Sequence, residues 1–87
     1  MSANSRNDHF FIYPRFEHGD LTGHTYCVLL RDGRMYEGSA LCSVNDNFEK
    51  KRGRALAFQR AILEYERDCS HKGIVPLNVH NPYLDRL

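Results

Sequence analysis

The chain has 87 residues, of which 41% are hydrophobic and 26% are charged, and its formal net charge is +1. This length predicts one domain, residues 1–87, that buries roughly 60 to 65% of its unfolded surface, and the composition excludes the apolar-poor, highly charged class of disordered proteins. No run of about 18 apolar residues and no apolar signal-peptide core occur, so we expect a cytoplasmic protein without a membrane partner.

The N-terminal part of the chain predicts one strand between two irregular segments. Residues 1–8 are polar and are expected to form a flexible N-terminus. The run from Phe10 to Tyr13 is rich in β-forming residues and predicts a strand, which Pro14 ends or confines to the sheet edge. Residues 17–23 contain two glycines among polar side chains, which is typical of a loop. We therefore expect the sheet within residues 9–42.

The clearest local signal is the pair Asp32-Gly33 between two β-forming runs, within the segment from Thr25 to Cys42. Both residues of a type I′ turn need a positive φ, and an Asp-Gly pair suits this need, so the sequence predicts a two-residue β-hairpin. Arg31 then pairs with Arg34 across the turn. The further predicted pairs are Leu30 with Met35, Leu29 with Tyr36, Val28 with Glu37 and Cys27 with Gly38.

Alternation along these strands divides their side chains between two faces. One face carries Tyr26, Val28, Leu30, Met35 and Leu41, and the other carries Cys27, Leu29, Tyr36, Ala40 and Cys42. The first face is the more apolar, so we expect it to receive the helix. Cys27 and Cys42 share a face but are out of register by roughly 13 Å, too far for a disulfide, and we interpret them as packing residues.

One long amphipathic helix is predicted within residues 46–70. Asp46 caps it and Glu49, three positions later, completes a capping box. From Phe48 to Cys69 apolar residues recur at the spacing of a helix with one buried side. The stripe consists of Phe48, Ala55, Phe58, Ile62, Tyr65 and Cys69, widened by Leu56 and Leu63.

The helix is expected to end no later than Gly73, which suits a helix terminus. Residues 74–87 are expected to be extended, and residues 74–79 could add a fourth strand at the sheet edge. The predicted fold class is therefore α+β, with a small antiparallel sheet of three or four strands and one long helix packed on one of its faces.

Residue spacing indicates neither a metal centre nor a catalytic site. The three cysteines and five histidines include no CxxC or HxxxH pair, which structural zinc sites usually need. Asp20 and His24 lie near each other, but such a pair is far more often a solvated turn than a catalytic dyad, and no nucleophile elbow or phosphate-binding glycine loop occurs. We expect a non-enzymatic protein without a cofactor, and the odd number of cysteines favours a reducing cytoplasm.

The predicted helix start is more informative, because it holds four basic residues within five positions. Lys50 and Arg54 fall on one side of the helix, along the same flank as Gly53, Ala57 and Ala61. Such a flank, bordered by cations, would let a partner backbone or a phosphate chain approach closely. With the hairpin turn added, the predicted partner-binding residues are Lys50, Lys51, Arg54, Arg31, Arg34, Gly53 and Ala57.

Two alternatives remain open for these residues. The flank could be an ordinary solvated helix face whose cations pair with nearby carboxylates. Gly53 argues for close contact, since glycine costs ~1 kcal/mol relative to alanine in an exposed helix, but the contacting group could equally be the sheet. The strand aromatics could also form a base-stacking platform on an uncovered sheet face, although such side chains are mostly core. These aromatics are Phe10, Phe11, Tyr13, Phe16, Tyr26 and Tyr36.

A hairpin, a Lys-Lys pair and an alanine-rich amphipathic helix follow one another from Tyr26 to Tyr65. This stretch resembles the C-terminal half of a double-stranded RNA-binding domain. In that family the basic helix start binds phosphates, and the resemblance implies this role for Lys50, Lys51 and Arg54.

A second resemblance rests on Asp32-Gly33, on Gly38-Ser39-Ala40-Leu41-Cys42 and on the segment from Asp46 through Ala57. These elements resemble small uncharacterised proteins of tailed phages. Phage proteins of this size often act as stoichiometric inhibitors of host machinery, including anti-CRISPR and other counter-defence proteins. The resemblance therefore implies a protein that works in the cytoplasm of a bacterial host.

The sequence thus predicts a non-enzymatic phage-type inhibitor that binds a bacterial protein or ribonucleoprotein complex. The alternative is a nucleic-acid-binding module that contacts phosphates through the basic helix start. Self-association as a homodimer through the flank of Gly53, Ala57 and Ala61 is a third hypothesis.

Overall fold

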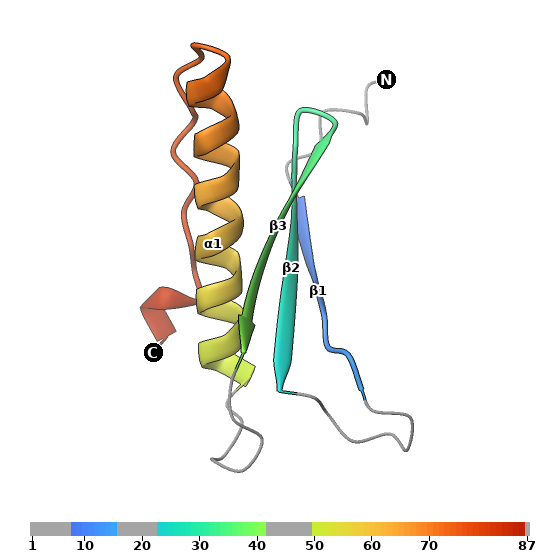
Figure 1. Ribbon diagram of the computed structural model, residues 1–87. Coiled ribbons are helices and arrows are strands. Elements are labelled where there is room, and N and C mark those ends of the chain that lie inside the picture. Colours follow the sequence, from blue (N-terminus) through green and yellow to red (C-terminus); the bar gives the residue numbers. More distant parts are fainter. Residues whose placement is uncertain (1–7, 16–22, 42–49, 87) are drawn as a thin grey trace, which may run out of the picture.

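The computed structural model of the chain describes residues 8–15, 23–41 and 50–86. Its elements, in chain order, are β1 (Asp8–Ile12), β2 (His24–Arg31), β3 (Arg34–Leu41), α1 (Lys50–His71) and the short 3-10 helix η2 (Leu84–Arg86). The strands form one antiparallel sheet in the order β1-β2-β3, and α1 lies along β3 and β2 (Figure 1). The α+β class is confirmed. In the described part of the chain no helix has the length and apolarity to cross a membrane.

Strand β1 confirms the predicted N-terminal strand, and Pro14 lies just after its end. The predicted fourth strand is not formed, because residues 74–80 have no strand conformation. This segment instead runs back beside α1, toward the helix start (Figure 1). Its contacts are described below, and they lie on the helix rather than on a sheet edge.

The hairpin and its register are confirmed residue by residue. Arg31 pairs with Arg34, and Cys27 pairs with Gly38. Asp32 has a φ of 51° and Gly33 a φ of 77°, the positive values that a type I′ turn requires at both central positions. The local chemistry of two turn residues therefore sets the register of both eight-residue strands.

The prediction of which sheet face receives the helix is wrong. The inner face, against α1, carries Thr25 and Cys27 at 0% exposure, together with Leu29 at 1% and Ala40 at 2%. The reason is size, because α1 approaches the sheet very closely. A Cβ on Gly38 would overlap backbone atoms of α1 at Ala57 and Ala61. Gly38 and the small side chains of Thr25, Cys27 and Ala40 permit this approach, whereas the bulkier side chains of the more apolar face do not.

Helix α1 is also turned relative to the predicted stripe. Leu56 and Leu63, which were expected to widen the buried stripe, are 37% and 49% exposed. Small residues widen the stripe on the opposite side instead, where they meet the inner face of the sheet. The buried residues of α1 are Gly53, Ala55, Ala57, Phe58, Ala61, Ile62, Tyr65 and Cys69.

The C-terminal end of α1 follows the expected glycine motif. Gly73 has a φ of 70°, the N–H of Ile74 donates to the carbonyl of Cys69 at 2.8 Å, and the N–H of Gly73 donates to the carbonyl of Ser70 at 3.1 Å. These two bonds form a Schellman motif, which satisfies carbonyls that a helix end leaves unpaired. The predicted cap Asp46 and its partner Glu49, like Phe48 and Cys42, lie outside the described residues.

The segment after α1 is fastened to the helix by side-chain hydrogen bonds. The Nδ2 of Asn81 donates to the carbonyl of Ala55 at 3.0 Å and to Oε1 of Gln59 at 3.3 Å. The N–H of Leu77 donates to the hydroxyl of Tyr65 at 3.1 Å. Asn81 is 6% exposed, so its paired amide supports the fold from within rather than facing solvent.

Tyr83 connects this segment to strand β1. Its ring meets the rings of Phe11 and Phe58 at centroid distances of 5.1 Å and 5.6 Å, and its hydroxyl lies 2.7 Å from Nε2 of His9. Burial in this aromatic cluster lowers the pKa of His9, although the carboxylate of Asp8 acts in the opposite direction. The cluster thus joins β1, α1 and the C-terminal segment.

Candidate functional site

The basic helix start divides into exposed cations and one engaged arginine. Lys51 and Arg52 are exposed to solvent. Arg54 is half-buried, where its Nη1 donates to the hydroxyl of Tyr13 at 3.3 Å and its guanidinium carbon lies 5.9 Å from the centroid of the Tyr83 ring. Arg54 therefore braces the helix against aromatic side chains instead of projecting toward a partner. Only the backbone of Lys50 is described.

The small-residue flank of α1 faces the sheet. Ala57 and Ala61 are 0% exposed, and a Cβ on Gly53 would lie 2.6 Å from Oγ1 of Thr25. The group that approaches Gly53 is thus strand β2, as one of the two sequence alternatives proposed. Gly53 and Ala57, predicted as partner-binding residues, are covered by the chain itself, and the flank is not available for self-association.

The two halves of the predicted binding site lie at opposite ends of α1. Arg34, just after the hairpin turn, lies beside Asp68 and His71 near the last turns of the helix. The 22 residues of α1 span about 33 Å from these turns to Lys51 at the other end. Figure 1 shows the turn at the top, level with the orange end of α1, and the yellow start of α1 at the bottom. The turn and the basic helix start therefore form no single surface.

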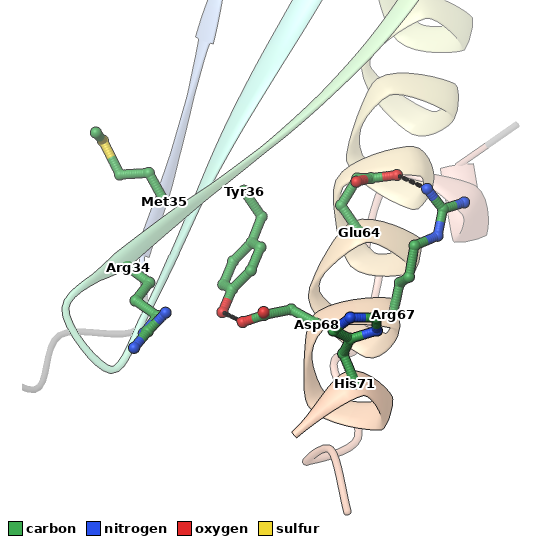
Figure 2. Close-up of a pocket in the computed structure, with 7 residues that line it drawn as sticks. All are labelled: Arg34, Met35, Tyr36, Glu64, Arg67, Asp68 and His71. Atoms are coloured by element: carbon green, nitrogen blue, oxygen red, sulfur yellow. Dashed lines mark hydrogen bonds and ion pairs between the residues drawn. The ribbon is translucent and has the colours of Figure 1, made fainter. Parts of the chain in front are cut away.

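An open groove of about 660 Å³ lies between the hairpin tip and the end of α1 (Figure 2). The hydroxyl of Tyr36 donates to Oδ2 of Asp68 at 2.6 Å, and Nζ of Lys72 lies 3.0 Å from the same oxygen. The residues that line the groove are Arg34, Met35, Tyr36, Glu64, Arg67, Asp68 and His71.

The acidic groups of this groove are already engaged. The hydrogen bond to Asp68 raises the pKa of Tyr36 to about 12, and the same bond, followed by that from Lys72, holds the pKa of Asp68 below its usual value. Arg67 pairs with Glu64 at 2.8 Å. Because Tyr36 stays protonated and Asp68 ionised at neutral pH, this pair does not supply a group that exchanges protons near pH 7.

The face of the sheet opposite α1, which we call the outer face, is apolar. Phe10 and Ile12 are 47% and 46% exposed, and Met35 and Leu41 are 70% and 65% exposed. Figure 2 shows Met35 on the side of β3 opposite to Tyr36 and α1. Pairing of the strands aligns three rows across this face. The rows are Asp8–Leu30–Met35, Phe10–Val28–Glu37 and Ile12–Tyr26–Ser39.

At each edge of the sheet a side chain occupies a backbone group that a further strand would need. In this register the N–H and C=O groups of His9 on β1, and of Ser39 on β3, point away from β2 toward solvent. The N–H of His9 donates to Oδ1 of Asp8 at 2.7 Å, and the carbonyl of Ser39 accepts from Nη1 of Arg60 at 2.6 Å. Occupied edge groups hinder the addition of a further strand.

The alternative of a base-stacking platform on an uncovered sheet face requires the strand aromatics to share one face. They are divided between the two faces: Phe10 and Tyr26 lie on the outer face, whereas Phe11 and Tyr36 point to the inner face. Phe16 lies outside the described residues. The signal that would have found the outer face is the set of small residues at alternate positions, Thr25 and Cys27 on β2 and Gly38 and Ala40 on β3, which marks the helix side.

Two of the three cysteines lie in the described part of the chain. Cys27 and Cys69 are buried free cysteines, and burial raises the pKa of Cys27 to about 11. Within residues 8–15, 23–41 and 50–86, no three His, Cys, Asp or Glu side chains gather closely enough to hold a metal ion. Comparison of the chain with protein-family models, with curated proteins and with solved structures finds no match.

Proposed function

We propose that this chain is a non-enzymatic binding protein of the phage counter-defence type, such as an anti-CRISPR inhibitor, that occupies a site on a bacterial protein complex through its outer face. The observation that supports this proposal is the exposure of four large apolar side chains on one face of the sheet: Phe10, Ile12, Met35 and Leu41. A contiguous exposed apolar patch on a small protein commonly marks an interaction site.

Burial of the exposed apolar side chains of this face contributes to binding. Full burial of a side chain of this kind stabilises by about 1.5 to 3 kcal/mol, so completing the burial of four half-exposed side chains contributes on the order of 4 kcal/mol. Association costs about 4 kcal/mol or more, so flanking contacts must supply the net free energy of binding. Four such anchors resemble the small set of residues that dominates most protein interfaces.

The test is affinity capture from a bacterial lysate with the wild-type chain and two matched variants. Phe10→Ser removes an outer-face anchor, and Leu63→Ser removes a side chain of nearly equal exposure, 47% against 49%, from the solvent side of α1. We expect Phe10→Ser to lose the stoichiometric partner seen by mass spectrometry, and Leu63→Ser to retain it. Circular dichroism checks that both variants are folded. Equal capture by both variants, or no partner of the wild type, contradicts the proposal.

The second candidate function is nucleic-acid binding at the helix start. The observation in its favour is that Lys51 and Arg52 are exposed in a helix whose first turn has no acidic residue within its described part. In this function each contacted phosphate contributes about −0.9 to the slope of log affinity against log salt concentration. We expect the double change Lys51→Glu and Arg52→Glu to abolish such binding. No detectable binding to duplex or single-stranded nucleic acid at low salt excludes it.

A further inference from the structure

Resting on the proposed function, we infer that the outer face accepts one amphipathic helix of the partner protein, whose apolar stripe is bordered on both sides by lysine or arginine. The helix lies along β2, with its apolar stripe against Phe10, Ile12, Leu30 and Met35. Four features of the face lead to this occupant: its size, its edges, its charge and the positions of its two carboxylates.

The size of the face matches a helix. Three strands spaced about 4.8 Å apart give a width of about 14 Å. The eight residues of β2 and of β3 at ~3.4 Å give a length of about 27 Å, and the five residues of β1 give about 17 Å. A helix with side chains is about 10 to 12 Å wide, and about 18 residues cover about 27 Å. The face therefore offers roughly 340 Å², less than half of the ~800 Å² per partner that a standard interface buries.

The edges direct the partner to the face. The Asp8 carboxylate occupies the N–H of His9 on β1, and the Arg60 guanidinium occupies the carbonyl of Ser39 on β3. A partner that added a strand would have to displace one of these side chains. A helix requires no backbone hydrogen bonds from the sheet, because its own backbone groups are satisfied internally.

The charge of the face is negative. Among the described residues of the three strands, the outer face carries the carboxylates of Asp8 and Glu37 and no lysine or arginine. All the described arginines of the hairpin, Arg31 and Arg34, alternate to the inner face. A negative apolar surface repels phosphate and favours a cationic partner.

The two carboxylates border the path of a helix on opposite sides. Asp8 lies on β1 and pairs with Leu30, whereas Glu37 lies on β3 and pairs with Val28, so β2 runs between them. A helix along β2 thus has one acidic residue at each border of its apolar stripe. This arrangement complements basic side chains on both flanks of that stripe, as in the amphipathic helices that dock in apolar grooves.

The test uses a synthetic 18-residue amphipathic peptide of leucine and lysine as the probe, and the same peptide with glutamate in place of lysine as the counter-probe. Binding to the full chain is measured by isothermal titration calorimetry at low and high salt. We expect the lysine peptide to bind about tenfold more tightly than the glutamate peptide, since exposed ion pairs contribute a few-fold each, and this preference to shrink at high salt.

Three variants locate the binding surface. The double change Asp8→Asn and Glu37→Gln removes both charges, and we expect it to reduce the preference for lysine to below about twofold. Phe10→Ser is expected to weaken binding of the lysine peptide about tenfold, whereas Leu63→Ser leaves it unchanged. Circular dichroism and the Leu63→Ser control separate loss of binding from loss of folding.

Each other outcome overturns the inference. Equal affinity for both peptides, no binding of either, or binding that Phe10→Ser leaves unchanged removes the cationic helix as the occupant. A dimer in analytical ultracentrifugation that Phe10→Ser dissociates assigns the face to a second copy instead. If Phe10→Ser abolishes capture from lysate while the lysine peptide does not bind, the proposed function stands and the helix inference falls. If Phe10→Ser changes neither capture from lysate nor binding of the lysine peptide, both the proposed function and the helix inference are refuted.

Discussion

Replacement of Gly38 by alanine tests the close packing of α1 on β3. Gly38 pairs with Cys27 in the middle of the sheet, on the inner face. A Cβ at this position would overlap the carbonyl oxygen of Ala57 and the amide nitrogen of Ala61, which are backbone atoms of α1. Neither atom can move aside without moving the helix, so the whole contact between α1 and the sheet must open.

The sign of the change in the free energy of unfolding distinguishes overpacking from the intrinsic strand preference of alanine over glycine. Glycine in a strand interior is about 0.5 to 1 kcal/mol less favourable than alanine, so preference alone predicts that Gly38→Ala stabilises. Overpacking of a close contact costs about 1 to 3 kcal/mol, and more where backbone must shift. We expect a net loss of about 3 kcal/mol. A chain of 87 residues has a free energy of unfolding of roughly 4 to 13 kcal/mol, so this loss is a large fraction of it.

Thermal and urea unfolding followed by circular dichroism measure this loss, which corresponds to a fall in Tm of about 12 °C or more. The matched control is Gly33→Ala, at a turn position with a φ of 77° and no atom within 4 Å of the added Cβ. Only backbone strain acts there, and we expect a loss of about 1 kcal/mol. If Gly38→Ala is as stable as the wild type, or less destabilised than Gly33→Ala, the close approach of α1 to β3 is refuted.

Two further changes probe the inner face. Gly53→Ala should destabilise by about 1 kcal/mol, because the added Cβ meets Oγ1 of Thr25. In a Thr25→Ala background the cost of Gly53→Ala should be lower by about 1 kcal/mol or more. If the two changes in the free energy of unfolding are additive, the contact is contradicted. The pKa of His9 lies below its ordinary value of 6.5 in the folded chain, so the stability that neutral His9 provides is complete above pH 6.5 and declines as the pH falls below it. In the wild type the urea concentration at the unfolding midpoint should therefore fall between pH 6.5 and pH 5, and in His9→Gln it should fall less. The same pH dependence in both proteins would argue against this role of His9.

Local chemistry made the hairpin predictable. Asp32 and Gly33 have few alternatives to a type I′ turn, and once the turn has two residues every cross-strand pair follows from counting. The end of α1 was predictable for the same reason, because Gly73 supplies the left-handed residue that a Schellman motif requires. Both features depend on a few neighbouring residues and not on the rest of the fold.

The buried sheet face was not predictable from apolar content. Both faces of the hairpin carry apolar side chains, and the deciding term is how closely a helix can approach. Gly38 and Ala40 on β3 permit the approach, and Ala57 and Ala61 on α1 complement them. Side-chain volume, considered together with hydrophobicity, would have selected the correct face and would have placed Leu63 in solvent.

The separation of the hairpin turn from the basic helix start could have been predicted from the sequence. Strand β3 runs away from the hairpin turn for eight residues, so a helix that follows it and packs on the same sheet must return toward that turn. Lys51 is therefore remote from Arg34, and Asp68 is close to it. The engagement of Arg54 by Tyr13 and Tyr83 depends on long-range packing, and no local pattern of residues indicates it.

The contact between His9 and Tyr83 also bears on the order in which the protein matures. These residues are 74 positions apart, so a growing chain completes the aromatic cluster only after Tyr83 has left the ribosome. The His9 ring meets Phe58 directly at a centroid distance of 4.7 Å, but until Tyr83 is added both rings lack part of their covering. The sheet and the helix are therefore complete in sequence before the native core is complete, and the last step of its folding requires Tyr83.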